Sequence, residues 1–206
     1  MSDSTDSTHP GYQISESSIG DEMSRLFEKI EGRIIICTFA SQISRIQEIF
    51  SLAEKFGRRI YVQGRSMNDN IEIAKQIGYM KFNPQTIIQE NEIRHMPDNK
   101  IIVLGTGAQG ENNAFLMRVV NNEHRTIRLK PGDTVIFSSS VIPGNERSIQ
   151  NLKDQIVRQG GRVIHYEMLD VHAGGHAKQE DLKLMMRLLK PKYFMPIEGS
   201  HYMLQA

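Results

Sequence analysis

The chain has 206 residues, of which 39% are hydrophobic and 24% charged, a composition typical of a folded globular protein and too apolar for a disordered one. Its 25 basic and 24 acidic side chains leave a formal charge of +1, so any nucleic-acid site has to be local. A single cysteine, Cys37, excludes a disulfide framework and a thiolate zinc cluster. No apolar run approaches the ~20 residues of a membrane span, and no signal-peptide pattern is present, so we expect a cytoplasmic protein.

Helical and strand patterns alternate along almost the whole chain. Helices are predicted at 19–30, 43–56, 70–77, 112–121, 149–157 and 182–189. Short apolar, often β-branched runs predict strands at 33–38, 60–62, 100–104, 134–137, 162–165 and 193–195. Residues 81–99, which contain Pro84 and Pro97, are expected to form an irregular surface connection. The alternation predicts an α/β fold with a parallel sheet, whose functional loops should follow the carboxyl ends of strands.

The loop Gly105–Gly110 follows the strand predicted at 100–104 and matches the pattern G-x-G-x-x-G. In dinucleotide-binding turns such glycines let the backbone approach a pyrophosphate, so a Rossmann-like nucleotide binder is one alternative. No acidic residue ends the next strand to bind a ribose, and Glu111 places negative charge beside the expected phosphate position. These departures favour a tight turn or an interaction loop over a nucleotide site.

The serines Ser138–Ser140 lie between the strand at 134–137 and the helix that follows it. Three hydroxyls together with the N–H groups at a helix start would form a cradle for an anion. A serine-rich helix cap explains the same residues equally well. The sequence leaves both interpretations open.

The loop at 170–177 carries two histidines, His172 and His176, on either side of Gly174 and Gly175. The glycines permit close backbone approach to a ligand and disfavour a helix, so shared metal ligation by the two histidines is not expected. Glu198 follows the strand predicted at 193–195, where a carboxylate can serve as a metal ligand, a base or a solvated loop acid.

Nine segments of the chain, taken in order, carry a resemblance to a known family. They are Ser2–Thr5, Pro10–Tyr12, Ser15–Glu16, Thr38–Ser41, Arg45–Gln47, Gly64–Met67, Gly105–Glu111, Ser138–Glu146 and His172–Ala177. Their order and spacing resemble ribonuclease J, a β-CASP member of the metallo-β-lactamase superfamily. The resemblance covers essentially the whole chain.

The resemblance implies an α/β architecture, with a parallel-sheet β-CASP domain and a returning piece of a metallo-β-lactamase fold. Residues 1–15 would end the first metallo-β-lactamase segment, 16–168 would form the β-CASP RNA-specificity domain, and 169–206 would form the returning segment. Enzymes of this family are zinc-dependent, degrade RNA from a 5′-monophosphorylated end and also cut internally. Their main metal ligands lie upstream of the position of Asp3, so this chain alone is expected to be an inactive part of such an enzyme.

The resemblance also assigns roles to individual residues. Asp3 matches a motif carboxylate that orients His176, and His176 would supply the proton to the leaving 3′ oxygen. The residues expected to bind the 5′ phosphate are His172, Ala173, Gly174, Gly175, His176, Ser138, Ser139 and Ser140. Glu198 stands where the family carries a zinc-binding histidine, and a carboxylate there favours Mn²⁺ or Mg²⁺ more than an imidazole does.

The expected partners are RNA and either a second copy of the chain or a protein that carries the absent metallo-β-lactamase half; a membrane is not expected. A non-catalytic RNA-binding subunit is the second function hypothesis, and the nucleotide binder with Gly105–Gly110 the third. Tyr193, Phe194 and Met195 are expected to expose apolar surface. The arginines at 58, 59 and 65 are expected to form a solvated face.

Overall fold

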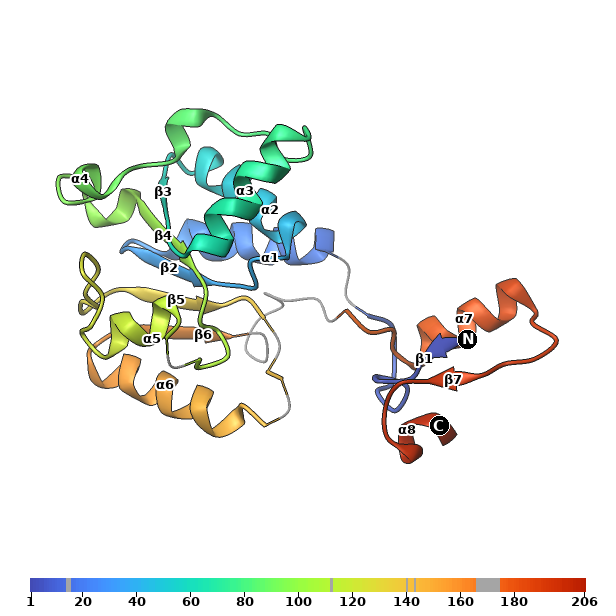
Figure 1. Ribbon diagram of the computed structural model, residues 1–206. Helices are drawn as coiled ribbons and strands as arrows, with labels where there is room; N and C mark the ends of the chain where they lie inside the picture. Colours follow the sequence, from blue (N-terminus) through green and yellow to red (C-terminus); the bar gives the residue numbers. More distant parts are fainter. Residues whose placement is uncertain (14–15, 112, 140, 143, 166–174) are drawn as a thin grey trace. The chain divides into compact units, whose positions relative to one another are not determined.

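The computed structural model describes residues 1–13, 16–111, 113–139, 141–142, 144–165 and 175–206 (Figure 1). The chain divides into two compact units, Ile19–His172 and a smaller one built from Met1–Ser18 and Ala173–Ala206. The helices and strands of the larger unit are α1 (Glu16–Lys29), β2 (Ile34–Cys37), α2 (Ile43–Lys55), β3 (Arg59–Val62), α3 (Arg65–Gln76), η1 (Pro84–Thr86), α4 (Glu90–Ile93), η2 (Asp98–Lys100), β4 (Ile101–Gly105), α5 (Phe115–Val120), β5 (Thr134–Phe137), α6 (Glu146–Arg158) and β6 (Arg162–His165). The smaller unit contains β1 (Ser2–Asp3), α7 (Gln179–Leu189), β7 (Pro196–Ile197) and α8 (His201–Gln205).

The larger unit is organised around a five-stranded parallel sheet with the strand order β3-β4-β2-β5-β6. The central strand β2 ends at Cys37, which pairs with Gly105 of β4 on one side and with Phe137 of β5 on the other. The loops after these three strands therefore leave the sheet side by side. The chain passes from β2 toward β3 and later crosses to β5, so this carboxyl edge is also the point where the winding changes direction, the usual ligand position in such sheets.

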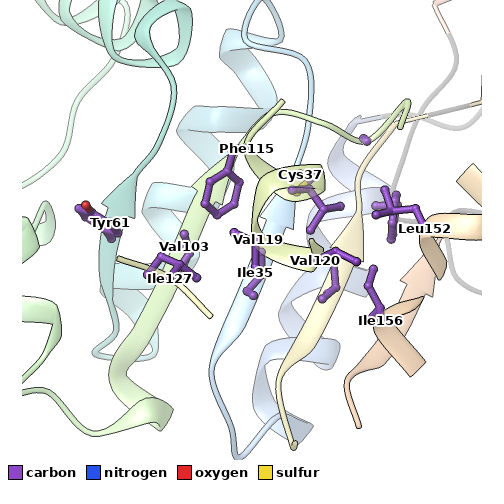
Figure 2. Close-up of a cluster of buried hydrophobic side chains, with 14 of the residues drawn as sticks. Ile35, Cys37, Tyr61, Val103, Phe115, Val119, Val120, Ile127, Leu152 and Ile156 are labelled. Atoms are coloured by element: carbon purple, nitrogen blue, oxygen red, sulfur yellow. The ribbon is translucent and has the colours of Figure 1, made fainter. Parts of the chain in front are cut away.

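Helices cover both faces of the sheet, with α1, α2 and α3 on one face and α5 and α6 on the other (Figure 1). Side chains alternate along each strand, so Ile35 and Cys37 of β2 point to one face and Ile34 and Ile36 to the other. Ile35 and Cys37 belong to a buried cluster with residues of α5 and α6 (Figure 2). All four side chains of β2 are fully buried, as expected for the centre of a doubly covered sheet.

Buried arginines join the amino ends of the strands to the backbone around them. Arg33 donates to both carboxylate oxygens of Asp133, at 3.0 and 2.6 Å, and to the carbonyl oxygen of Arg128 at 2.6 Å. Arg58, which we expected on a solvated face, is buried and donates to the carbonyl oxygens of Ile30 and Gly32. That expectation was wrong because two carbonyl groups before β2 satisfy the guanidinium inside the fold.

The two ends of the chain pair in the smaller unit. Strand β1 runs parallel to β7, with Ser2 opposite Pro196 and Asp3 opposite Ile197. The strand predicted at 193–195 is wrong, because β7 lies just after it and pairs with β1, outside the five-stranded sheet. Tyr193, Phe194 and Met195 are exposed by 81%, 45% and 59%, which confirms the expected apolar surface.

Other boundaries differ from the sequence pattern for local reasons. Helix α3 begins five residues earlier than predicted, because Gly64 takes a left-handed φ of +102° and turns the chain directly from β3 into the helix. Helix α5 spans only Phe115–Val120 of the predicted 112–121. The connection at 81–99 contains two short helices and the start of a third, and it buries Ile88 and Ile93. Among the described residues, no helix has both the length and the apolar character to cross a membrane.

We expect Asp133→Ala to lower the free energy of unfolding by about 3–5 kcal/mol, because it leaves the Arg33 guanidinium buried without its carboxylate. The matched control is Asp98→Ala, which removes the half-exposed pair with Lys130 and should cost below about 1 kcal/mol. Urea unfolding followed by circular dichroism measures both. Equal losses in the two variants would contradict a structural role for the buried pair.

Candidate functional site

The loops after β2 and β5 are tied together at the carboxyl edge of the sheet. The N–H of Thr38 donates to the carbonyl oxygen of Gly105, the last residue of β4, at 3.2 Å. Its hydroxyl lies 3.0 Å from the carbonyl oxygen of Ser138 and 2.9 Å from Oε1 of Gln42, so both acceptors share one proton. The N–H of Ser138 donates in turn to the carbonyl of Cys37 at 2.9 Å.

A buried arginine holds the first serine of this loop. Nη1 of Arg45, on α2, donates to Oγ of Ser138 at 2.5 Å, and its Nε lies 3.5 Å from Oε2 of Glu48. Arg45 is 1% exposed and Ser138 fully buried. The sequence marks Arg45 only as part of a matching segment, and its link to the serine loop is a tertiary contact between α2 and the residue that follows β5.

The second serine is held from the glycine-containing loop. Nε2 of Gln109 donates to Oγ of Ser139 at 3.2 Å, while its Oε1 accepts from the N–H of Ile142 at 2.9 Å. Ser139 is buried as well. The two described serine side chains therefore accept hydrogen bonds from Arg45 and Gln109. Ser140 lies outside the described residues.

The three glycines of the G-x-G-x-x-G pattern are explained by packing within the chain. A Cβ at Gly105 would overlap the ring of Phe115. Gly107 and Gly110 have φ values of +107° and +71°, and a Cβ at either would come within 3.0 Å of a neighbouring side chain. Helix α5 starts only at Phe115, so the pattern does not open directly into a helix as a dinucleotide-binding turn does. The geometry favours the tight-turn interpretation.

In the smaller unit, the structure brings together the two residues expected to be catalytic. Nδ1 of His176 lies 2.6 Å from Oδ2 of Asp3, although 173 residues separate them. The other carboxylate oxygen accepts the N–H and the hydroxyl of Thr5, at 3.0 and 2.7 Å. Because an ionised carboxylate only accepts, the ring hydrogen belongs on Nδ1, which leaves Nε2 for proton exchange.

The strand and helix on either side fix the positions of these two residues. Asp3 ends β1, where Ser4 donates its N–H to the carbonyl of Ile197 at 2.9 Å. The carbonyl oxygen of His176 accepts from Nε2 of Gln13 at 2.9 Å. The N–H of Gln13 donates to Asp181, in the first turn of α7, at 2.8 Å. His176 thus approaches Asp3 through hydrogen bonds between segment 9–13 and the start of α7.

Asp3 has a lowered pKa. Burial acts to raise the pKa of Asp3, but it is outweighed by the hydrogen bonds from the Thr5 hydroxyl, His176 and the Thr5 backbone N–H, together with the charge of His176. The net result is a pKa below its usual 3.8. The carboxylate therefore stays ionised beside the imidazole at neutral pH.

Glu198 lies just past β7, at the same end of the β1–β7 pair as Asp3. It is exposed, and its φ of +59° followed by Gly199 at +99° makes a sharp turn before α8. Within the described ranges, no group of three or more His, Cys, Asp or Glu side chains is close enough to hold a metal ion. Of the other predicted residues, Gly175 is described and exposed, whereas His172, Ala173 and Gly174 lie outside the described residues.

We expect the Asp3 carboxyl carbon, followed by ¹³C NMR, to titrate below pH 3.8 and Thr5→Val to raise that midpoint, because valine removes the donated hydroxyl bond. The ionised carboxylate stabilises the fold above about pH 4, and this contribution is lost as the pH falls through the lowered folded-state pKa. Ser7→Ala, which removes a bond to Met203, serves as the control. An unchanged midpoint in Thr5→Val would refute the role of the hydroxyl.

Arg45→Met should speed hydrogen exchange at the Ser138 amide by roughly tenfold or more, because loss of a donor to a buried oxygen costs about 1–3 kcal/mol locally. Arg58→Met is the matched control, since this arginine is also buried but binds carbonyls at the amino end of the sheet. If both variants accelerate Ser138 equally, the effect is global and Arg45 does not hold the loop.

Comparisons with known proteins assign the chain to a family. The family model described as "Ribonuclease J, beta-CASP domain" matches residues 31–156, which is more than half of the chain. Ribonuclease J of Helicobacter pylori (strain 26695) is 41% identical over 201 residues, covering 98% of this chain and 29% of the relative. Ribonuclease J 1 of Streptococcus pyogenes is 43% identical over 203 residues, covering 98% and 36%.

Ribonuclease J2 of Bacillus subtilis is 36% identical over 206 residues, covering all of this chain and 37% of the relative. The chain therefore spans about a third of the length of the relatives it matches. The matched residues include the whole of β2, β3, β4 and β5, and with them the loops after β2, β4 and β5 described above. The parallel α/β unit and these similarities show that the chain belongs to the ribonuclease J β-CASP family.

Proposed function

We propose that the chain is the RNA-specificity part of a metal-dependent ribonuclease that senses a 5′ monophosphate and cuts RNA both from that end and internally. The observation that carries the proposal is the 2.6 Å contact between His176 and Asp3, which gives an exposed imidazole a fixed tautomer and an ionised partner. The relatives named ribonuclease J support the choice of RNA as substrate.

The two units would correspond to parts of two different domains of such an enzyme. Residues 16–168 would form the β-CASP domain, and 1–15 with 169–206 would complete a metallo-β-lactamase fold supplied by a longer chain or by a partner. The exposed apolar side chains of the smaller unit support this division. They are Leu184, Met185, Leu188, Leu189, Tyr193, Phe194, Met195 and Tyr202. A surface of this kind is typical of an interface with another domain.

His176 would act as the general acid. Its Nε2 would deliver a proton to the leaving 3′ oxygen, while Asp3 holds Nδ1 and stabilises the imidazolium. The 5′ phosphate would be bound by the backbone of 172–176 and by the hydroxyls of Ser138–Ser140. Arg45 and Gln109 would then act as positioning residues for the serine loop, because each donates to a serine oxygen.

Among the described residues, Glu198 could supply one ligand to a metal ion. Glu198 is an exposed carboxylate at the same end of the strand pair as Asp3, and oxygen ligands suit Mn²⁺ and Mg²⁺ as well as Zn²⁺. One carboxylate does not hold a catalytic metal, and the further ligands would be supplied, as in the family, by a longer chain or a partner. When bound, such a metal supplies an activated hydroxide for attack on phosphorus.

A non-catalytic RNA-binding subunit is the second candidate. It would need only the residues proposed to bind phosphate and no metal ligands. Both candidates require the 5′-phosphate pocket. Only the first requires His176 to move a proton.

We expect the chain to bind 5′-monophosphorylated RNA about tenfold more tightly than the same RNA with a 5′ hydroxyl, since charge-assisted hydrogen bonds contribute roughly 1.5–3 kcal/mol. Fluorescence anisotropy of two oligonucleotides labelled at the 3′ end measures this. Ser139→Ala should reduce the preference, and Ser51→Ala, on the exposed side of α2, should leave it unchanged. Equal affinity for both ends would rule out the pocket.

In an active enzyme that contains these residues, His176→Ala should lower kcat by roughly 10²–10⁴ with little change in RNA affinity. Asp3→Asn should also lower kcat, because an amide can donate to Nδ1 and stabilise the wrong tautomer. Steady-state cleavage of a 5′-monophosphorylated substrate provides the measurement. A wild-type rate in His176→Ala would remove the proton-donor role and favour the non-catalytic candidate.

A further inference from the structure

A polar pocket lies in the larger unit, at the carboxyl ends of β3 and β4. Its volume is about 520 Å³, which is within the range of small-ligand sites. The side chains around it that matter for binding are Gln63, Arg65, Ser66, Asp69, Asn113 and Arg118. None of the residues proposed to bind the 5′ phosphate or to act in catalysis lines this pocket.

A histidine with a fixed tautomer anchors the floor of the pocket. Nδ1 of His124 accepts the N–H groups of Thr126 and Ile127, at 3.2 and 3.0 Å, so the ring hydrogen is on Nε2. Nε2 donates to Oε1 of Gln63 at 2.9 Å. The Gln63 amide is therefore oriented with its nitrogen as a donor; one N–H goes to the carbonyl of Val62 at 2.9 Å, and a second remains.

The surroundings keep this histidine neutral. Burial lowers the pKa of His124 first, and the charges of Arg118 and Arg128 lower it further, whereas Glu90 raises it. His124 is 6% exposed and packs edge-on against Phe115, with ring centroids 5.2 Å apart. His124 therefore holds Gln63 in place without adding charge. The charge of the pocket comes from the residues around its opening.

The rim carries two arginines and one carboxylate. Arg65 and Arg118 are exposed, and within the described residues the side chain of neither makes a hydrogen bond or an ion pair. Asp69 is the single acidic residue of the lining, so the pocket has an excess positive charge. The first backbone N–H groups of α3, beside Arg65, make no hydrogen bond to a capping side chain, because the N-cap residue Gly64 has no side chain.

Guanidinium groups with planar N–H donors are suited to phosphate oxygens, and two of them in one concave site provide both charge and geometry. The aromatic rings of the lining are buried, so they offer no face on which a base could stack. The pocket is therefore suited to bind a phosphate group without recognising the base attached to it.

We propose that this pocket binds a phosphate group, provided either by a nucleotide or by the backbone of single-stranded RNA, independently of the 5′-phosphate pocket. Arg65 and Arg118 bind its oxygens, Gln63 and the first turn of α3 add neutral donors, and Asp69 weakens the site. The proposal rests on the pocket itself and does not require the chain to be a nuclease.

The test is titration of the ¹⁵N-labelled 206-residue chain with inorganic phosphate, uridine monophosphate, uridine, and a short oligouridylate with a 5′ hydroxyl. We expect the phosphate-containing probes to shift the amide signals of Gly64, Arg65 and Ser66, and uridine to shift none of them. Because the oligouridylate carries no terminal phosphate, its binding here is independent of the proposed 5′-phosphate pocket. Tighter binding of the oligonucleotide identifies backbone phosphate as the source, and tighter binding of the mononucleotide identifies a nucleotide.

Three variants and a matched control decide the assignment. Arg65→Gln and Arg118→Gln should each weaken binding at least fivefold. Asp69→Asn should tighten it about threefold, a gain that misfolding cannot imitate. Arg158→Gln removes an equal charge at the end of α6, outside the pocket lining, and should leave affinity unchanged. Absence of shifts at these amides, equal shifts with uridine, or equal weakening by Arg158→Gln would overturn the proposal.

Discussion

The in-register parallel pairing of β2 with β4 and β5 is the constraint on which the larger unit depends. Since Cys37, Gly105 and Phe137 end their strands at one level, the loops that follow have to share one small region of the sheet edge. Their polar groups are then buried, and buried polar groups need partners. Thr38 and Gln109 meet that need by joining loops from different strands, and Arg45 does so from α2, so the polar network at the edge is a consequence of the register.

Much of the larger unit follows from the sequence, because its strands are short β-branched runs and its helices have clear apolar faces. The strands predicted at 134–137 and 162–165 are confirmed without any shift. The run 193–195 misled the prediction, since apolar side chains are typical of a buried strand and these are exposed. The prediction for Arg58 failed in the opposite sense: a charged residue expected at the surface is buried, because carbonyl groups distant in sequence accept its hydrogen bonds.

The functional sites also differ in how far the sequence could predict them. No local pattern connects Asp3 with His176, and only the family resemblance brought them together before the structure showed their 2.6 Å contact. The G-x-G-x-x-G match, in contrast, was local and ambiguous, and the three-dimensional neighbours of each glycine favour close packing over ligand approach. Arg45 and the pocket beside α3 depend on tertiary neighbours throughout, so no inspection of single segments could have found them.

The smaller unit is assembled from the two ends of the chain, with Ser7 bound to Met203 across 196 residues. Closing so long a loop in an unfolded chain is entropically unfavourable, although the penalty grows only with the logarithm of loop length. Folding of the larger unit makes the intervening chain compact and so lowers that penalty. We therefore expect the sheet of the larger unit to form before Asp3 and His176 are brought together.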